Sequence, residues 1–238
     1  MMLLIGIVRQ LALPILRVPV YVLPTPDVIA VAMWQVPDQV FSHAAATLAT
    51  VLAGFALAIA VALPLAALMS LSSFAQVAIY PLLVLTQSVP KVALAPLLLL
   101  LLGTGVLPKI LVTFLVAFFP LVIAVATGLA ATPPELIELG RSLRAGKIKE
   151  LIRIRGPYAV PFIFGGLKVA MTLSVIGAVV GEFVASDQGL GFLMTSQLAF
   201  FNTPLAFGAI IVLSLMGIVL FQSVVLAERY FFPWSSRD

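Results

Sequence analysis

Long uncharged apolar runs separated by short polar segments dominate the chain. Residues 44–70 contain no charged side chain, and a run of that length can cross a hydrocarbon layer of about 30 Å as a single helix. Three further long apolar runs cover residues 110–129, 161–182 and 204–226. Because backbone polar groups in lipid must be hydrogen-bonded internally, each run predicts a transmembrane α-helix.

Two other apolar segments are less regular. Residues 77–102 are interrupted by Pro81, Pro90 and Pro96, so we expect one kinked span with a polar middle. Residues 3–23 contain two arginines and two prolines and predict a weaker sixth span, with an interfacial amphipathic helix as the alternative. A signal peptide is disfavoured, because no basic residue precedes this apolar run.

The composition agrees with a membrane protein and excludes several kinds of site. The 238 residues are 63% hydrophobic and 9% charged, with a mean hydropathy of +1.23, far from the balance of a soluble domain. We therefore expect an all-α membrane protein of five to six transmembrane helices, forming one domain over residues 1–238. With no Cys and a single His, His43, the chain offers no disulfide, no thiolate nucleophile, no zinc site built on sulfur and no His-rich metal cluster.

Charge is concentrated in the segment 135–157, which holds nine charged residues. Six of the 13 basic residues lie there: Arg141, Arg144, Lys147, Lys149, Arg153 and Arg155. Lys and Arg favour the cytoplasmic side, so we expect this segment and the C-terminus to be cytoplasmic. Segments 24–43 and 182–203, expected outside, contain no Lys or Arg. Lys109, in a short outer loop, is an exception.

Two short amphipathic helices are predicted around this segment. The first starts with Thr132 as N-cap and Pro133 at the first helical position, and Gly146 offers its stop; the second ends at Gly156-Pro157. Their apolar faces carry Leu136, Leu139, Gly140 and Leu143, then Ile148, Leu151 and Ile152. Either the segment only fixes membrane topology, or its ordered apolar faces dock another protein.

The spacing here resembles the EAA motif in permease subunits of ATP-binding-cassette importers, which reads E-A-A, three residues, G, nine residues, I, one residue, L-P. The matching positions are held by Glu138, Leu139, Gly140, Ile154 and Pro157, with Leu139-Gly140 where Ala-Ala is usual. Arg144 stands at the position of the usual Gly, and Gly156 replaces the Leu before the proline.

The resemblance covers most of the chain. It includes VLPTPDVI at 22–29, ATLATVLAGFALAIAVALPL at 46–65, TQSVPKVALAPL at 86–97, GTGVLPKIL at 103–111, FFPLVIAVATGL at 118–129, GLKVAMTLSVIGAVVGEF at 166–183 and QGLGFL at 188–193. The group contains permeases for nitrate, sulfonates and taurine, and those for thiamine-precursor pyrimidines or riboflavin. SVPKVALAPL, VIGAVVGEF and LAERYFFPW are most similar to the pyrimidine and riboflavin branch.

The resemblance implies a type I importer permease in a bacterial inner membrane, with a cytoplasmic coupling loop over about residues 130–160. It implies a homodimer, two ATPase subunits and an extracytoplasmic binding protein as partners, and no nucleic acid. No G-x-x-x-x-G-K-[ST] phosphate loop occurs, so we expect a partner to use ATP and this chain to hold no cofactor. The candidate ATPase contacts are Glu138, Leu139, Gly140, Arg141, Leu143 and Arg144.

Polar groups at membrane depth indicate a substrate pathway, since they are costly unless they face a cavity or a partner. The candidates are Gln87, Ser88, Lys91, Thr172 and Glu182. In a continuous helix ending at Leu102, Lys91 would lie about 16 Å inward. Each candidate also has a purely structural alternative, such as bonding a backbone carbonyl. Three glycines are expected to permit close helix approach instead: Gly165, Gly166 and Gly177.

These observations predict the transmembrane subunit of an ATP-driven importer, for a thiamine-precursor pyrimidine or a riboflavin-like compound. Sulfonate, taurine or nitrate are the alternative substrates. A secondary transporter or channel is the alternative of another class, but inverted repeats and several membrane-depth carboxylates are missing from the sequence. We expect no enzyme, because the chain lacks H-E-x-x-H and a nucleophile paired with a base.

Overall fold

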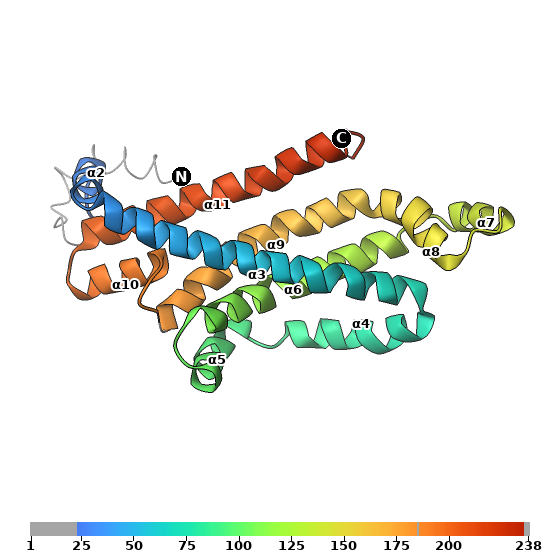
Figure 1. Ribbon diagram of the computed structural model, residues 1–238, viewed down its shortest axis with the longest axis horizontal. Helices are drawn as coiled ribbons and strands as arrows, with labels where there is room; N and C mark the ends of the chain where they lie inside the picture. The colour runs from blue at the N-terminus through green and yellow to red at the C-terminus, as the bar shows by residue number, and fades with distance from the viewer. Residues whose placement is uncertain (1–22, 185, 236–238) are drawn as a thin grey trace.

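The computed structural model describes residues 23–184 and 186–235, which form helices joined by short loops (Figure 1). The elements are α2 (Pro26–Gln35), α3 (Pro37–Leu71), α4 (Ser73–Gln87), the 3₁₀ turn η1 (Lys91–Leu94), α5 (Ala95–Leu102), α6 (Val106–Ala130), α7 (Pro134–Ser142), α8 (Lys147–Glu150), the π-helical turn η2 (Leu151–Arg155), α9 (Gly156–Val184), α10 (Leu190–Ala199) and α11 (Thr203–Phe231). Within the described ranges, no strand is found.

Four helices in the described part of the chain are long and apolar enough to cross a membrane, and a bent pair raises the number to five if it forms one span. The four are α3, α6, the continuous helix Lys147–Val184 that contains α9, and α11. They include all four regular apolar runs. The all-α membrane fold is therefore confirmed, whereas the weaker span predicted over residues 3–23 lies outside the described residues.

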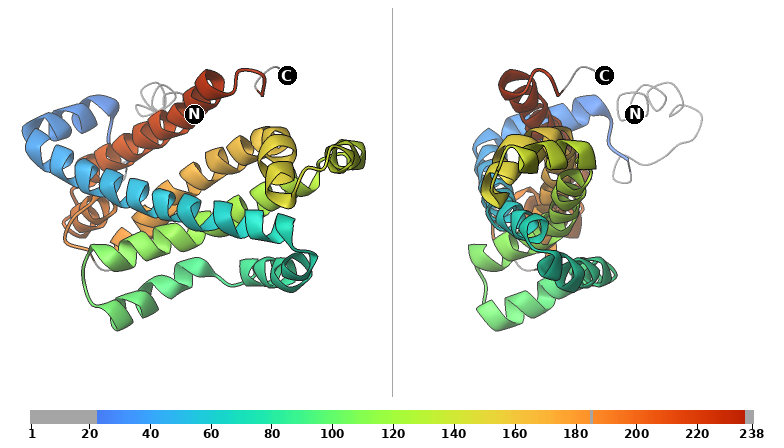
Figure 2. Two further views of the ribbon diagram at one scale, coloured as in Figure 1. Left: turned by 45° about the vertical axis from the view of Figure 1, so that its right-hand side comes forward. Right: turned by 90° about the vertical axis from the view of Figure 1, so that its right-hand side faces the viewer.

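Helix α6 lies at the centre of the bundle, because both α3 and α9 pack along it. Helices α2 and α10 lie at one end of the long axis and α7 and α8 at the other (Figure 1); we name these the α10 end and the α7 end. Both views of Figure 2 place α4 and α5 at one edge of the bundle and α11 at the opposite edge. Helix α11 packs on α9 and α10.

Glycines allow α6 and α9 to approach closely along their whole length. A β-carbon on Gly177 would lie 2.8 Å from Cα of Thr113, and one on Gly166 would lie 2.7 Å from Cβ of Ala124. Gly181 fits in the same way against Lys109 near the α10 end. Van der Waals packing drives helix association in lipid, so this close approach matters. The expectation for Gly166 and Gly177 is confirmed, while Gly165 faces open space.

The segment expected as one kinked span, residues 77–102, is sharply bent. Helices α4 and α5 meet at 84° across a short break. Pro81 lies inside α4 without ending it, and Pro96 sits in the first turn of α5, where a missing N–H costs nothing. The break falls before Pro90, because proline disfavours helical geometry at the preceding Val89. The expected kink therefore lies at this one break, and the expectation that the segment forms a single span stays a prediction.

A buried ion pair attaches the end of α11 to α9. Lys168 Nζ lies 2.5 Å from Glu228 Oε2, and Glu228 also accepts a hydrogen bond of 3.0 Å from Ser235 Oγ. The ring of Phe232 then contacts Phe164 of α9 at 5.5 Å. Glu228 is buried, and a buried carboxylate needs such a partner, so the pair helps to define where the last helix lies on the bundle.

We expect Gly177→Ala to destabilise the protein by about 1–3 kcal/mol, because the added methyl group meets the backbone of Thr113 and overpacks the contact. Gly165→Ala is the matched control, since nothing lies within 4 Å of its β-carbon. Heating the detergent-solubilised protein and measuring the fraction that stays monodisperse by size-exclusion chromatography compares the two. Equal midpoints would show that the α6–α9 contact tolerates extra volume.

Candidate functional site

The connector, which we define as residues 131–155, protrudes from the α7 end of the bundle (Figure 1). It begins directly after α6 and ends where α9 begins, so it joins the two helices in closest contact. It contains the charged segment and both predicted short helices. Its local geometry differs from the sequence prediction at three points, each with a physical reason.

The start of α7 is the first difference. Pro133, with extended backbone geometry, is the N-cap residue, and Pro134 occupies the first turn. The predicted cap Thr132 is buried, and its hydroxyl donates backward to Leu129 O at 3.2 Å. The prediction of Thr132 as N-cap and Pro133 as first helical residue was wrong by one position. The Thr132 hydroxyl bonds to the last turn of α6 instead of capping α7.

The end of α7 is the second difference. The helix ends at Ser142, and Arg144 adopts a left-handed conformation with φ of 56°. Arg144 N–H then donates to Arg141 O at 2.9 Å, and Ala145 N–H donates to Gly140 O at 2.9 Å. This pair of bonds is the Schellman motif, whose left-handed residue is usually glycine. Gly146, predicted as the stop, instead precedes α8 as its N-cap.

The passage from the connector into α9 is the third difference. Gly156-Pro157 was predicted to end the second short helix, yet α8, η2 and α9 run on as one continuous helix from Lys147 to Val184. Gly156 N–H bonds five residues back, to Leu151 O. We attribute the continuity to this π-helical turn, because the wider turn accommodates a proline that lacks an N–H.

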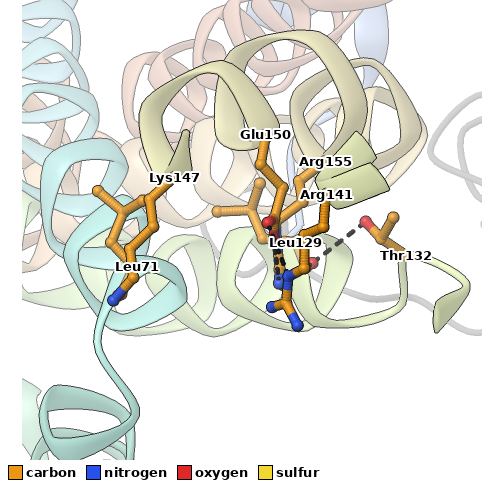
Figure 3. Close-up of polar contacts among 7 residues, drawn as sticks. All are labelled: Leu71, Leu129, Thr132, Arg141, Lys147, Glu150 and Arg155. Atoms are coloured by element: carbon orange, nitrogen blue, oxygen red, sulfur yellow. Dashed lines mark hydrogen bonds and ion pairs between the residues drawn. The ribbon is translucent and has the colours of Figure 1, made fainter. Parts of the chain in front are cut away.

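Glu150 organises the charges of the connector (Figure 3). Its side chain is buried and forms an ion pair with Arg155, with 2.7 Å between Arg155 Nη2 and Oε1, and a longer one with Arg141 at 3.5 Å. Arg155 Nη1 also donates to Leu129 O at 3.4 Å. One carboxylate therefore links α7, the π turn and the end of α6.

A second attachment joins the connector to α3. Lys147 Nζ donates to Leu71 O, the last residue of α3, at 3.4 Å (Figure 3). The C-terminal carbonyls of a helix lack intrahelical donors, and a cation there is favourable. The connector is thus held against the carbonyl ends of α3 and α6.

The outer surface of α7 and of the turn after it carries all but one of the predicted docking residues. Glu138, Arg141 and Arg144 are exposed, and so are Leu139 and Leu143, at 57% and 76%. Gly140 instead faces inward, where the side chain of Ile154 leaves no room for a β-carbon. The small residue and the isoleucine of the EAA-like spacing therefore contact each other, which explains their separation in sequence. The role of these residues in docking stays a prediction.

The polar break between α4 and η1 holds three of the predicted pathway residues. Gln87 and Ser88 are exposed, and Lys91 Nζ lies 3.3 Å from Gln87 O and 4.9 Å from the ring centre of Phe119. Lys91 begins the stretch Lys91–Leu102, which is bent by 84° from α4, and the depth of about 16 Å expected for Lys91 stays a prediction. A lining role for these residues stays a prediction.

Thr172 and Glu182, both on α9, differ in burial. Thr172 is exposed and lines a groove of about 590 Å³ between α9 and α11, together with Ser214 and Gln222. Its hydroxyl donates to Lys168 O at 3.1 Å. Glu182 is only 2% exposed and points into the protomer, where it bonds to other elements. In this structure it serves internal packing, and a role in the pathway stays a prediction.

Sequence reasoning did not single out Glu150, Arg155 or Lys109 as structural charges. Lys109, the exception among the outer segments, is buried and donates to Ser186 Oγ at 2.9 Å. The signal available in the sequence was that Lys109 is a basic residue in a segment expected to lie outside, where Lys and Arg are disfavoured. Glu150 and Arg155 are five residues apart and become partners across the π turn, a spacing that a regular helix would not pair. Among the described residues, no cluster of acidic residues or histidines could hold a metal ion.

Comparison with known proteins identifies the family. The model of the family "Binding-protein-dependent transport system inner membrane component" matches residues 54–237. The chain belongs to this family. It is therefore a multi-pass membrane component of an ABC importer rather than an enzyme, and membership implies partnership with an ATPase and a binding protein.

Several relatives in the family are similar over most of their length. The formylaminopyrimidine transport permease protein ThiX of Halalkalibacterium halodurans is 35% identical over 219 residues, covering 92% of this chain and 88% of the relative. The riboflavin transport system permease protein RibX of Chloroflexus aurantiacus is 34% identical, covering 92% and 82%. A putative aliphatic sulfonates transport permease protein, SsuC of Bacillus subtilis, is 28% identical, covering 90% and 78%.

The fold is similar to that of a solved importer. A chain of the MetNI methionine ABC transporter, in an inward-facing conformation, aligns with a TM-score of 0.58 at 19% identity, covering 81% of this chain and 97% of that chain. The likeness supports the fold alone at this identity. Together with the family match, it confirms the importer-permease architecture expected from the sequence.

We expect Arg144→Gly to stabilise the connector by about 0.5–1 kcal/mol, because glycine adopts the left-handed geometry without the penalty of a side chain. Arg144→Val should destabilise it, since β-branched residues fit that geometry poorly. Hydrogen exchange at the amides of residues 144 and 145 measures the effect. If valine protected these amides as well as glycine, the left-handed turn would not limit connector stability.

Proposed function

We propose that the chain forms the translocation pathway for a small heteroaromatic vitamin or vitamin precursor, of the thiamine-precursor pyrimidine or riboflavin type. The support is the similarity to ThiX and RibX at 35% and 34% identity over 92% of the chain. Import of a sulfonate, taurine or nitrate by the same machinery is the second candidate, favoured by the similarity to SsuC. Membership of the importer family sets aside a secondary transporter or channel.

The orientation we propose places the α7 end and the C-terminus in the cytoplasm of a bacterial cell, with the protein in its inner membrane. All six basic residues of the segment 135–157 gather on or beside the connector. Among the described residues of the α10 end, Asp27, Asp38 and Asp187 are accompanied by no comparable basic set, since Lys109 is buried. Excess Lys and Arg on one side favour the cytoplasm. The C-terminal end of α11 points toward the α7 end (Figure 1).

The connector is, in this proposal, the surface that receives the ATPase. The observation that carries it is the combination of exposed leucines and charges on α7 and the turn after it: Leu139 and Leu143 lie next in sequence to Glu138, Ser142 and Arg144, and Arg141 is exposed with them. Exposed leucines on a helix outside the apolar spans are costly in water, whereas a protein partner would bury them. Glu150 and Lys147 fix the connector to α6 and α3, so a push on α7 would reach the membrane helices.

Assembly in our proposal follows the expected stoichiometry of two copies of this chain and two ATPase subunits, with ATP bound by the ATPases alone. An extracytoplasmic binding protein delivers the substrate at the α10 end. The groove of about 590 Å³ beside Thr172 and the break holding Gln87, Ser88 and Lys91 are the proposed pathway surfaces. Lys91 beside Phe119 offers a cation next to an aromatic face, which suits a polar aromatic ring and also an anion.

We expect Leu143→Asp to weaken copurification with the ATPase by about tenfold or more, because docking would bury a carboxylate without a partner. Leu139→Asp should act in the same way. Leu198→Asp, at an exposed leucine of α10, is the control at the opposite end and should retain the ATPase. Elution volume and protease resistance of each permease monitor folding. Full retention of the ATPase by both connector variants would contradict docking on α7.

Uptake into vesicles that contain the permease, its ATPase and its binding protein tests the substrate. We expect ATP-dependent uptake of a labelled thiamine-precursor pyrimidine or of riboflavin, and none of taurine or nitrate. Mass spectrometry of the ligand that copurifies with the binding protein gives an independent answer, because the binding protein selects the solute. Uptake of a sulfonate alone would favour the second candidate.

A further inference from the structure

Three side chains from two helices hold the start of α10. Gly189 N–H donates to His43 Nδ1 at 3.0 Å, Leu190 N–H to Thr47 Oγ1 at 2.8 Å, and Gly191 N–H to Glu182 Oε2 at 2.7 Å. We name His43, Thr47 and Glu182 the α10 clamp; this list defines it. Its members come from α3 and α9, so the three consecutive amides tie α10 to both membrane helices.

The clamp is buried and internally connected. Thr47 is fully buried, and its hydroxyl lies 2.8 Å from Glu182 Oε1, to which it donates. A free helix N-terminus leaves several N–H groups without partners, and here three of them bond to side chains 9 to 146 residues away in the sequence. Breaking these three hydrogen bonds costs more free energy than breaking one exposed helix cap, because each buried polar group would be left without a hydrogen-bond partner.

The glycines of QGLGFL are required by the same contact. Gly189 has φ of 113°, and a β-carbon there would overlap the carboxyl group of Glu182. A β-carbon on Gly191 would lie 2.9 Å from Glu182 Oε2. Glu182 of VIGAVVGEF and the two glycines of QGLGFL therefore contact each other directly. This contact gives a structural reason for two of the stretches that resemble the family.

Histidine gives the clamp a property that threonine lacks. Nδ1 accepts the Gly189 N–H, so this nitrogen must carry a lone pair and no proton. Protonation of the ring converts both nitrogens to donors, which removes the acceptor. His43 is half-buried, and its ring centre lies 5.8 Å from that of Phe192 on α10. The protonated ring would therefore lie beside α10 without accepting the Gly189 N–H.

Within residues 23–184 and 186–235, few ionisable groups lie on the elements around His43. Helix α10 has none over Leu190–Ala199, and α11 has none before Glu228. On α3 the nearest is Asp38, and α2 contributes Asp27. Glu182 of α9 reaches the same turn through Thr47, with Lys109 of α6 close enough to interact with it electrostatically. The α9–α10 connection contributes Asp187.

Helix α10 leads into α11, the helix that forms one wall of the groove beside Thr172. Helix α10 ends at Ala199, and in the turn that follows Phe201 has a left-handed φ of 58° and its N–H donates to Leu198 O at 3.1 Å. Helix α11 starts two residues later and packs against α10. A shift of α10 would therefore move the first turns of α11.

We propose that His43, Thr47 and Glu182 are positioning residues that lock α10 onto α3 and α9, and that protonation of His43 from the α10 side releases this lock. The proposal rests on the proposed function, because it assumes that substrate passes from the α10 end. Transport then falls as the outer pH drops through the titration of His43, since the folded clamp requires the neutral ring.

Uptake by the complete permease–ATPase–binding-protein vesicles is measured across outer pH from about 5 to 8, the range in which histidine titrates. The wild-type protein should lose activity by about fivefold at the acid end, the effect of one hydrogen bond. His43→Asn should flatten the profile, because its amide oxygen replaces Nδ1 as an acceptor that does not titrate. His43→Leu should be low at every pH. Asp187→Asn is the control and should follow the wild-type profile.

Hydrogen exchange at the amides of residues 189–191 supplies a readout independent of transport. We expect protection in His43→Asn, its loss in His43→Leu, and a wider loss in Thr47→Val. Wild-type uptake that is independent of pH, or a His43→Leu protein with wild-type uptake and protection, would overturn the clamp proposal. Absence of ATP-dependent uptake by the wild-type protein at every pH would instead count against the proposed function.

Discussion

The close contact between α6 and α9 is the interaction on which the rest of the structure depends. Lipid gives two apolar helices no hydrophobic reason to associate, so the association relies on close packing, and Gly166, Gly177 and Gly181 supply it. Because the two helices share this contact over their length, their ends are fixed relative to each other. One pair of ends bears the connector, and the other bears Lys109 and the α9–α10 connection.

Buried charges then locate the elements that the apolar contact leaves free. Glu150 holds the connector, Glu228 with Lys168 holds the end of α11, and Glu182 holds the start of α10. A buried ion pair adds little net stability, but removing one partner is costly. The ion pairs of Glu150 and Glu228 therefore act chiefly by specifying position, and the hydrogen bonds of Glu182 do the same for the start of α10.

Both ends of the bundle also contain a non-glycine residue in left-handed geometry, Arg144 after α7 and Phe201 after α10. Each closes a helix with the same pair of backward backbone bonds. In both places the turn places large exposed side chains where the chain leaves the bundle. The strain is local to one residue in each turn.

The sequence by itself determined the membrane helices, the charge asymmetry and the connector, because these depend on composition and on periodicity within a single segment. It also indicated Glu138, Leu139 and Arg144 as surface positions through motif spacing. The 84° bend after α4, the π turn that carries Pro157 and the partners of Glu150 and Glu182 were decided only by tertiary structure. Each depends on a group that is distant in sequence or on a backbone irregularity, and hydrophobic periodicity contains no information about either.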